Sequence, residues 1–187
     1  FLHAFGTFAS RRAYDQVFLS CAYQKLNVKI IGMDAGITAT ANGGTHMPLE
    51  DMGIMRCIPD MCVVEPADGV MLPYLARHMA ATYGCFYLRF GRKKLMRVYG
   101  ENEQFAVGKA KKLREGRDAA VIACGILVHE ALVAAEMLRR EGIGITVLDM
   151  HTVKPVDADA VEQAARACGA IVTAENHNVI GGLGSAV

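Results

Sequence analysis

The side chains best suited to chemistry are gathered in one glycine-rich segment that runs from residue 36 to His46. Glycines let the backbone approach a ligand closely or adopt positive φ angles. Threonines, Asn42 and His46 add hydroxyl, amide and imidazole groups, which suit a substrate with many hydroxyls. Histidine also exchanges protons near neutral pH. A polar surface loop with a helix-capping histidine explains the same residues equally well, because a glycine-rich loop alone is weak support for a site.

Polar residues also follow short apolar runs that are typical of strands. Met33 to Gly36 follows the run 28–32, Glu65 to Asp68 follows the run 61–64, and Arg89 to Arg92 stands at the end of the run 86–90. Ligands of open parallel sheets bind at the carboxyl ends of the strands, so these segments are candidates for one binding edge. Arg92 could hold a phosphate with its planar guanidinium group, although a solvated charge is the commoner role.

Two aromatic residues and a second histidine have plainer explanations. Phe5 and Phe8 are three residues apart, and an aromatic pair at this helical spacing usually belongs to a core rather than stacking on a ligand. His177 follows the apolar run 170–174, where a capping or hydrogen-bonded histidine is the favoured interpretation.

Composition excludes several classes of protein. The chain has 187 residues, 52% of them hydrophobic, and a net charge of +1, which fits one or two domains with a substantial core. This charge gives no reason to expect a nucleic acid or membrane partner, and the basic stretches 89–94 and 109–117 are local. Six cysteines without a CxxC pair indicate buried thiols, such as Cys124 and Cys168, in a reducing compartment rather than a metal site. No apolar run reaches membrane-spanning length and no leader precedes the fold, so a cytoplasmic protein is expected.

Apolar runs alternate with segments of helical period, which predicts parallel sheets joined by right-handed crossovers. We expect an α/β protein with two consecutive parallel-sheet domains, over 1–100 and 118–187, joined by a charged linker over 101–117. The expected helices cover 8–25, 48–56, 67–82, 128–140 and 157–168, and the expected strands cover 28–32, 61–64, 86–90, 119–124, 144–148 and 170–174. Asp68 is a plausible cap for its helix. The chain starts at Phe1 and stops in a glycine turn, so both domains are expected to be incomplete at the outer ends.

Several motifs in this order resemble those of one enzyme family. The run Phe5-Gly-Thr-Phe-Ala-Ser-Arg-Arg-Ala-Tyr-Asp-Gln16 resembles the start of a helix in the pyrimidine-binding domain of transketolase-type thiamine diphosphate enzymes. Asn42-Gly-Gly-Thr-His-Met-Pro-Leu-Glu-Asp-Met-Gly-Ile-Met-Arg56 looks like their substrate loop and the helix after it. Further similar segments cover 64–68, 88–92, 148–155 and 173–185. Together they cover essentially the whole chain and are similar to the C-terminal subunit of split bacterial and archaeal transketolases.

The resemblance implies roles for individual residues. Phe5 and Phe8 would line the pocket for the aminopyrimidine ring of thiamine diphosphate. His46 would hydrogen-bond the sugar near its reacting carbons as the catalytic residue, and Arg92 would hold the distal phosphate. Met33 and Asn42 would occupy further substrate-binding positions. No metal ligand is implied in this chain, because the diphosphate and Mg²⁺ bind to the other domain of the family.

That other domain implies a partner. The expected partner is an N-terminal transketolase subunit, in a homodimer or heterotetramer that transfers a two-carbon ketol unit between sugar phosphates. The chain alone should be inactive. The family's activating glutamate, in a GIAEQN-like motif, lies ahead of the region where this sequence begins.

Departures from the family pattern keep alternatives open. Asn42 stands where the family usually has Asp, Met33 where many members have histidine, and Arg11 where some place a third aromatic. An amide cannot accept a proton or carry charge as a carboxylate does, so sugar preference is open. Deoxyxylulose-phosphate synthase and the beta subunit of 2-oxo acid dehydrogenases share parts of the pattern. A non-catalytic scaffold or regulatory remnant of the same fold is the alternative from another class.

Overall fold

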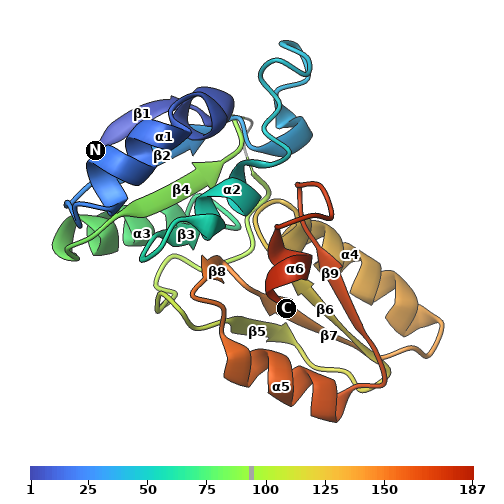
Figure 1. The fold of residues 1–187 in the computed structure, drawn as a ribbon. Coiled ribbons are helices and arrows are strands. Elements are labelled where there is room, and N and C mark those ends of the chain that lie inside the picture. The colour runs from blue at the N-terminus through green and yellow to red at the C-terminus, as the bar shows by residue number, and fades with distance from the viewer. Residues whose placement is uncertain (93–94) are drawn as a thin grey trace.

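The computed structural model describes residues 1–92 and 95–187 and contains two sheets (Figure 1). Lys93 and Lys94, which end the basic run noted above, lie outside the described residues. The five-stranded sheet has the order β1 (Leu2–Phe5), β2 (Lys29–Met33), β4 (Phe86–Phe90), β3 (Cys62–Val64) and β8 (Thr152–Lys154). The four-stranded sheet has the order β5 (Lys111–Arg114), β7 (Ile145–Asp149), β6 (Ala119–Ala123) and β9 (Ile171–Ala174). The predicted α/β class is confirmed.

Both sheets are mixed rather than purely parallel, which corrects the expectation at two edges. β8 runs antiparallel to β3, and β5 runs antiparallel to β7, whereas the other described pairings are parallel. β5 falls within the segment 101–117 that was predicted to be a linker, so part of that segment belongs to the second sheet. β8 comes from the second half of the chain but joins the first sheet, so the two halves interlock.

Helices follow the strands largely where the periodicity predicts them. The first helical region consists of η1 (Phe8–Arg12), α1 (Tyr14–Gln16) and η2 (Val17–Ala22), of which η1 and η2 have the wider π-helical turn. After β2 comes a short 3₁₀ turn, η3 (Gly36–Thr38). The remaining helices are α2 (Asp51–Cys57), α3 (Met71–Ala81), α4 (Leu127–Arg140), α5 (Ala158–Ala167) and α6 (Leu183–Ala186).

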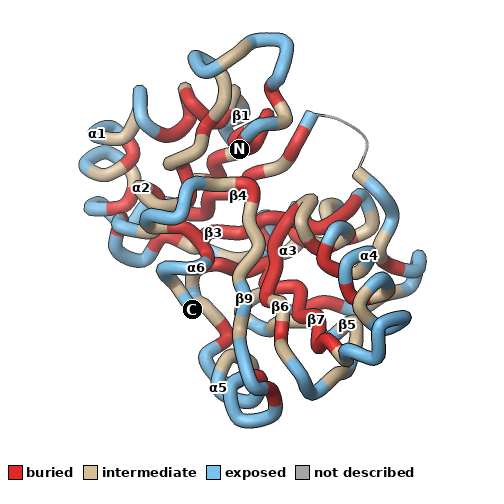
Figure 2. The backbone as a smooth tube through the Cα atoms, turned by 90° about the vertical axis from the view of Figure 1, so that its right-hand side faces the viewer, coloured by how far each residue is buried: buried red, intermediate tan, exposed pale blue. Residues whose placement is uncertain are grey.

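Helices cover both faces of the second sheet. α4 and α5 lie on opposite sides of it (Figure 1). Accordingly, Val128 and Ala131 of α4 belong to one core cluster, whereas Ala164 of α5 belongs to the other. Buried residues follow β3, β6 and β7, whereas the outer loops are exposed (Figure 2). Cys124 and Cys168 are buried, as predicted. Within the described ranges, no helix is both long and apolar enough to cross a membrane.

α3 begins at Met71 with Val70 as its N-cap residue, later than the predicted start at Asp68, but Asp68 still binds the start of the helix and joins it to a second segment. Its Oδ1 accepts hydrogen bonds from the backbone N–H groups of Val70 and Met71, at 2.9 and 3.1 Å. Its Oδ2 accepts from the backbone N–H groups of Val98 and Tyr99, at 2.8 and 2.9 Å. This buried carboxylate therefore fixes the start of α3 to the chain that leaves the first sheet.

Candidate functional site

The pairing register lines up the carboxyl ends of β1, β2 and β4. Phe5 of β1 pairs with Met33 of β2, which in turn pairs with Phe90 of β4. The chain therefore leaves three neighbouring strands at the same level and turns toward Phe8, Asp34 and Arg92. This arrangement is the binding edge expected for an open parallel sheet.

Three of the predicted site residues meet at this edge in one aromatic cluster. The ring centroids of Phe5 and Phe8 are 5.8 Å apart, with an angle of 86° between the ring planes. The imidazole of His46 lies 5.2 Å from the centroid of each phenyl ring, again edge to face. Edge-to-face contact is a favoured geometry for aromatic pairs. All three rings are half-buried, so the cluster is neither solvated nor part of the closed core.

Two tight turns bring His46 to this cluster. Asn42 N–H donates to the carbonyl of Ala39 at 3.1 Å, and His46 N–H donates to the carbonyl of Gly43 at 3.0 Å. Gly43 has a φ of 70°, a left-handed conformation that favours glycine. Thr45 Oγ1 lies 2.9 Å from His46 Nδ1, which fixes the ring. Among the described residues, Nε2 makes no hydrogen bond, so it is the nitrogen available to a ligand.

Arg92 borders the cluster and is paired with a buried acid. Its Nε donates to Asp34 Oδ1 at 3.0 Å, and its Nη2 lies 2.6 Å from Asp34 Oδ2. The Arg92 side chain is 50% exposed, whereas that of Asp34 is fully buried. The guanidinium carbon is 5.4 Å from the centroid of the Phe5 ring, within the range of a cation–π contact. Arg92 thus presents a partly used set of donors beside the aromatic cluster.

The other predicted substrate residues have looser positions. Met33 is half-buried at the end of β2, next to Phe5 in the register. Asn42 is exposed on the turn, and no described hydrogen bond joins its amide to the cluster. Arg11, which stands at the third aromatic position, pairs with Glu50 at 2.8 Å and donates to the carbonyl of Thr45 at 3.4 Å. Arg11 therefore ties the first helical region to the loop that carries His46.

A cavity of about 540 Å³ adjoins Arg92. It is bordered by the ends of β3 and β4, the start of α3 and the chain after Arg92. Its lining residues are Pro66, Asp68, Gly69, Val70, Leu72, Phe90, Gly91, Arg92, Leu95, Arg97 and Glu101. This volume and the largely apolar lining are those of a small-molecule pocket.

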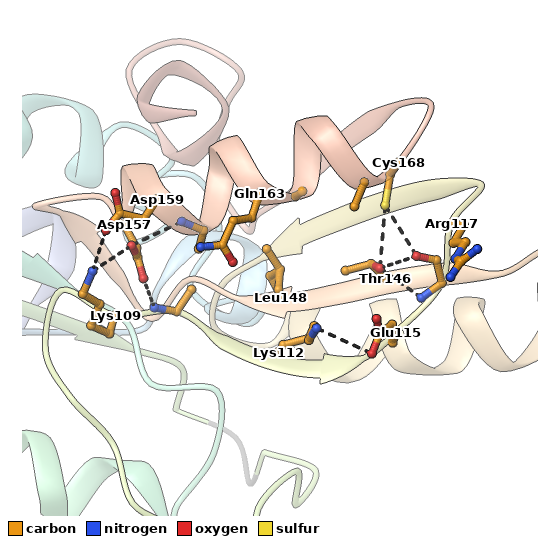
Figure 3. Close-up of a pocket in the computed structure, with 15 residues that line it drawn as sticks. Lys109, Lys112, Glu115, Arg117, Thr146, Leu148, Asp157, Asp159, Gln163 and Cys168 are labelled. Atoms are coloured by element: carbon orange, nitrogen blue, oxygen red, sulfur yellow. Dashed lines mark hydrogen bonds and ion pairs between the residues drawn. The ribbon is translucent and has the colours of Figure 1, made fainter.

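A larger cavity of about 750 Å³ lies between α5 and strands β5 and β7 (Figure 3). None of the predicted site residues lines it. Lys109 Nζ lies 3.3 Å from Asp157 and 3.1 Å from Asp159, and Lys112 Nζ lies 3.6 Å from Glu115. Because its lysines already have acidic partners, this cavity is not an obvious anion site.

Sequence reasoning missed a buried charge network centred on Arg89, in the middle of β4. Arg89 is fully buried; its Nε donates to Asp51 and its Nη1 to Glu65, both at 2.9 Å. The hydroxyl group of Tyr87 donates a hydrogen bond to Asp51 Oδ2 at 2.7 Å. Nη2 of Arg89 donates to the backbone carbonyl of Asn176 at 3.1 Å. The network joins the two halves of the chain, so Glu65 is structural and does not line the aromatic cluster.

Burial and mutual charge shift the protonation equilibria of this network. Burial raises the pKa of Glu65, and the positive charge of Arg89 opposes that shift. Burial alone would lower the pKa of Arg89, but Asp51 and Glu65 more than offset this and raise it. Burial also raises the pKa of Tyr87, and the charge of Asp51 adds to the effect. The signal for this network was an arginine inside an otherwise apolar strand, since a buried charge requires a partner.

His177 and Arg56 make contacts between the two halves of the chain, and both have structural roles. His177 accepts a hydrogen bond from the N–H of Gly53 at its Nε2, at 3.3 Å, and its Nδ1 lies 2.8 Å from the carbonyl of Asn178. The favoured interpretation of His177 as a hydrogen-bonded histidine is therefore confirmed. Arg56 donates to the carbonyls of Gly181 and Gly182, so it holds the last turn rather than facing a ligand.

Comparison with known proteins agrees with the fold. Residues 1–97 match the family model of the transketolase pyrimidine binding domain, and residues 108–187 match that of the transketolase C-terminal domain. The chain is 54% identical over 186 residues to the 6-deoxy-6-sulfo-D-fructose transketolase subunit SqwH of Clostridium sp. (strain MSTE9), covering 100% of this chain and 58% of that protein. It is 39% identical over 177 residues to an apulose-4-phosphate transketolase subunit of Phocaeicola vulgatus, covering 94% of this chain and 57% of that protein.

A solved structure of a related protein has the same fold. A split gene transketolase, described as an inactive beta4 tetramer, superposes with a TM-score of 0.91 at 40% identity, covering 98% of this chain and 59% of that chain. The present chain thus spans a little under three fifths of these relatives. Because the two family models between them match nearly all of its length, the chain belongs to the transketolase family.

Proposed function

We propose that this chain is a subunit of a thiamine diphosphate-dependent transketolase that transfers a two-carbon ketol unit between sugar phosphates. The observation that carries the proposal is the cluster of Phe5, Phe8 and His46 beside Arg92, at the aligned ends of three parallel strands. The named relatives are transketolase subunits, which favours ketol transfer over deoxyxylulose-phosphate synthesis and 2-oxo acid dehydrogenation.

The aromatic cluster fits a flat heterocycle. Phe5 and Phe8 meet edge to face and remain half-buried, so part of their ring surface can contact the aminopyrimidine of thiamine diphosphate. When bound, this cofactor supplies the carbon nucleophile that carries the ketol unit. The phenyl rings of this chain would hold the pyrimidine in one orientation and exclude water from one side of it.

His46 and Arg92 would act on the sugar. The free Nε2 of His46 can hydrogen-bond a substrate hydroxyl and exchange a proton with it. Arg92 would contact the terminal anion, whose remote binding energy positions the reacting end. Met33 and Asn42 remain proposed substrate contacts. One relative is named for a sulfonated ketose and another for a sugar phosphate, so the proposed terminal group is a tetrahedral anion.

A partner subunit would complete the site. We expect an N-terminal transketolase subunit to hold the diphosphate and Mg²⁺, within a homodimer or heterotetramer. The related split gene transketolase is an inactive beta4 tetramer, which supports the proposal that such a chain needs its partner for activity. Pentose phosphate metabolism in the cytoplasm is the proposed setting.

The proposal is tested by reconstitution. The full-length subunit is mixed with its partner subunit, thiamine diphosphate and Mg²⁺, and ketol transfer from xylulose 5-phosphate to ribose 5-phosphate is assayed. We expect transfer from the mixture and none from either subunit alone. Absence of transfer while the cofactor is bound would refute the assigned reaction, although the family assignment would stand.

A further inference from the structure

Asp34 is a fully buried acid that faces the proposed anion contact. Both of its carboxylate oxygens lie within ion-pair distance of Arg92, at 3.0 Å from Nε and 2.6 Å from Nη2. The Nε contact is a hydrogen bond and the Nη2 contact is a close ion pair, so both carboxylate oxygens lie beside the guanidinium. Asp34 therefore sets both the direction and the effective charge of the Arg92 guanidinium.

The backbone keeps Asp34 in this place. Met33 pairs with Phe90 at the ends of β2 and β4, and Ala35 N–H donates to the carbonyl of Phe90 at 3.2 Å. Asp34 has a φ of 62°, a left-handed conformation that aspartate and asparagine tolerate better than most residues. The position of its carboxylate is thus fixed by the strand ends rather than by a flexible side chain.

The ion pair between Arg92 and Asp34 has little net charge, although the guanidinium still carries N–H donors. One N–H group of Arg92 is used in the hydrogen bond to Asp34 Oδ1, and Nη2 lies close to Oδ2 as an ion pair. Because the side chain is half-exposed, the guanidinium can still offer N–H donors to a ligand. A ligand anion bound there gains hydrogen bonds from Arg92 but is repelled by the nearby carboxylate. The repulsion grows with the charge of the ligand. A phosphate monoester carries about −1.5 to −2 at pH 7, whereas a sulfonate carries a single negative charge.

We propose that Asp34 is a specificity-determining residue that biases this site toward a singly charged terminal group, a sugar sulfonate, over a doubly charged sugar phosphate. The inference rests on the proposed function, because it assumes that Arg92 contacts the terminal group of the donor sugar. Asp34 acts through Arg92 and does not touch the reacting carbons.

The test compares two donors in the complex of the full chain with its partner subunit. kcat/KM is measured for 6-deoxy-6-sulfofructose and for fructose 6-phosphate, with the wild-type chain and with Asp34→Asn. Asparagine keeps the shape and tolerates the backbone conformation but removes the charge. We expect the wild type to favour the sulfonate and Asp34→Asn to shift the ratio toward the phosphate by about tenfold, or about 1.4 kcal/mol.

A second carboxylate of the same region supplies the control. Glu50 pairs with Arg11 at 2.8 Å rather than with Arg92, so Glu50→Gln should change the ratio less than about twofold. An equal shift in both variants would show a general effect of loop charge and overturn the role of Asp34. An unchanged ratio in Asp34→Asn would overturn it as well.

Calorimetric binding of the two sugars to the same complexes gives the ratio without turnover. If neither donor supports transfer, the proposed reaction fails, while the binding ratio still decides the role of Asp34. If transfer occurs but Asp34→Asn changes neither the kcat/KM ratio nor the binding ratio of the two sugars, the reaction stands and the specificity proposal is wrong.

Discussion

Arg89 and Arg92 lie three residues apart, one inside β4 and the other just beyond its end, yet their surroundings differ completely. Arg89 is fully buried between Asp51 and Glu65 and reaches the carbonyl of Asn176 across the two halves of the chain. Arg92 is 50% exposed, and Asp34 is its acid partner among the described residues. The first arginine therefore joins the two halves of the chain, and the second is the one that we propose contacts a ligand.

The difference shows that strand position decides the role of a charge more than residue type does. A charge inside the strand must be neutralised by the protein, because no water reaches it. A charge just beyond the strand end meets both the protein and the solvent, which suits a binding edge. The half-buried edge of Phe5, Phe8, His46 and Arg92 and the buried network of Arg89 should accordingly respond differently to mutation.

The largest effect is expected at His46 of the exposed edge. His46→Ala should lower the turnover of the reconstituted complex by about 10²- to 10⁴-fold, because a group that takes part in proton transfer is lost. The thermal unfolding temperature of the His46→Ala chain should change little. His129→Ala, in α4 and away from the aromatic cluster, is the matched control and should keep the wild-type rate. Steady-state kinetics measure both, and an unchanged rate in His46→Ala would return this histidine to a loop-capping role.

Arg89→Met should destabilise the buried network by about 3 to 5 kcal/mol, because it leaves Asp51 and Glu65 as uncompensated buried charges. Urea unfolding measures the change in the free energy of unfolding. Arg166→Met removes an arginine that is 77% exposed on α5 and should stay within about 0.5 kcal/mol of the wild type. Equal stability of the two variants would contradict the structural role of Arg89.

The buried region should also make stability depend on pH. Burial raises the pKa of Asp149 from 3.8 to about 7, and burial lowers the pKa of His151 from 6.5 to about 4. The folded chain then holds more protons at Asp149, so this residue removes stability as the pH rises from about 4 to 7. His151 has the opposite sign, because its unfolded form binds more protons between about 4 and 6.5.

Asp149→Asn separates these opposing contributions. The stability of the variant relative to wild type should increase as the pH rises from 4 to 7, by about 1.4 kcal/mol for each unit of the lost pKa shift. Tyr99, whose hydroxyl donates to Asp149 at 2.6 Å, can still hydrogen-bond the amide. Urea unfolding at several pH values gives the two curves. Parallel curves would mean that Asp149 titrates normally.

Much of the fold could be predicted from hydrophobic periodicity, and the failures have physical causes. β1 contains His3 and β8 contains Lys154, so neither forms a continuous apolar run like that of β3, which is equally short. β5 reads Lys-Lys-Leu-Arg, and its charges suggest a linker, although charged residues are common on edge strands. Periodicity also says nothing about β8 joining the first sheet, since that pairing links distant parts of the chain.

The sequence predicts those residues of the candidate site that lie both near a strand end and within a motif of the family. Phe5, Phe8 and His46 were chosen from sequence, and the structure brings their rings together. Asp34 was missed as a partner of Arg92 because the two are 58 residues apart, and only the strand register brings them together. The catalytic and binding roles, including those of Met33 and Asn42, remain predictions.

In the proposed complex, Arg92 faces the terminal anion of the substrate. The ratio of kcat/KM for fructose 6-phosphate to kcat/KM for unphosphorylated fructose, measured for wild type and Arg92→Ala in the reconstituted complex, tests this placement. The wild type should prefer the anionic donor, and Arg92→Ala should lower the ratio by about tenfold or more, as expected when a charged hydrogen-bond donor is removed. An unchanged ratio would contradict the placement of the substrate anion at the end of β4.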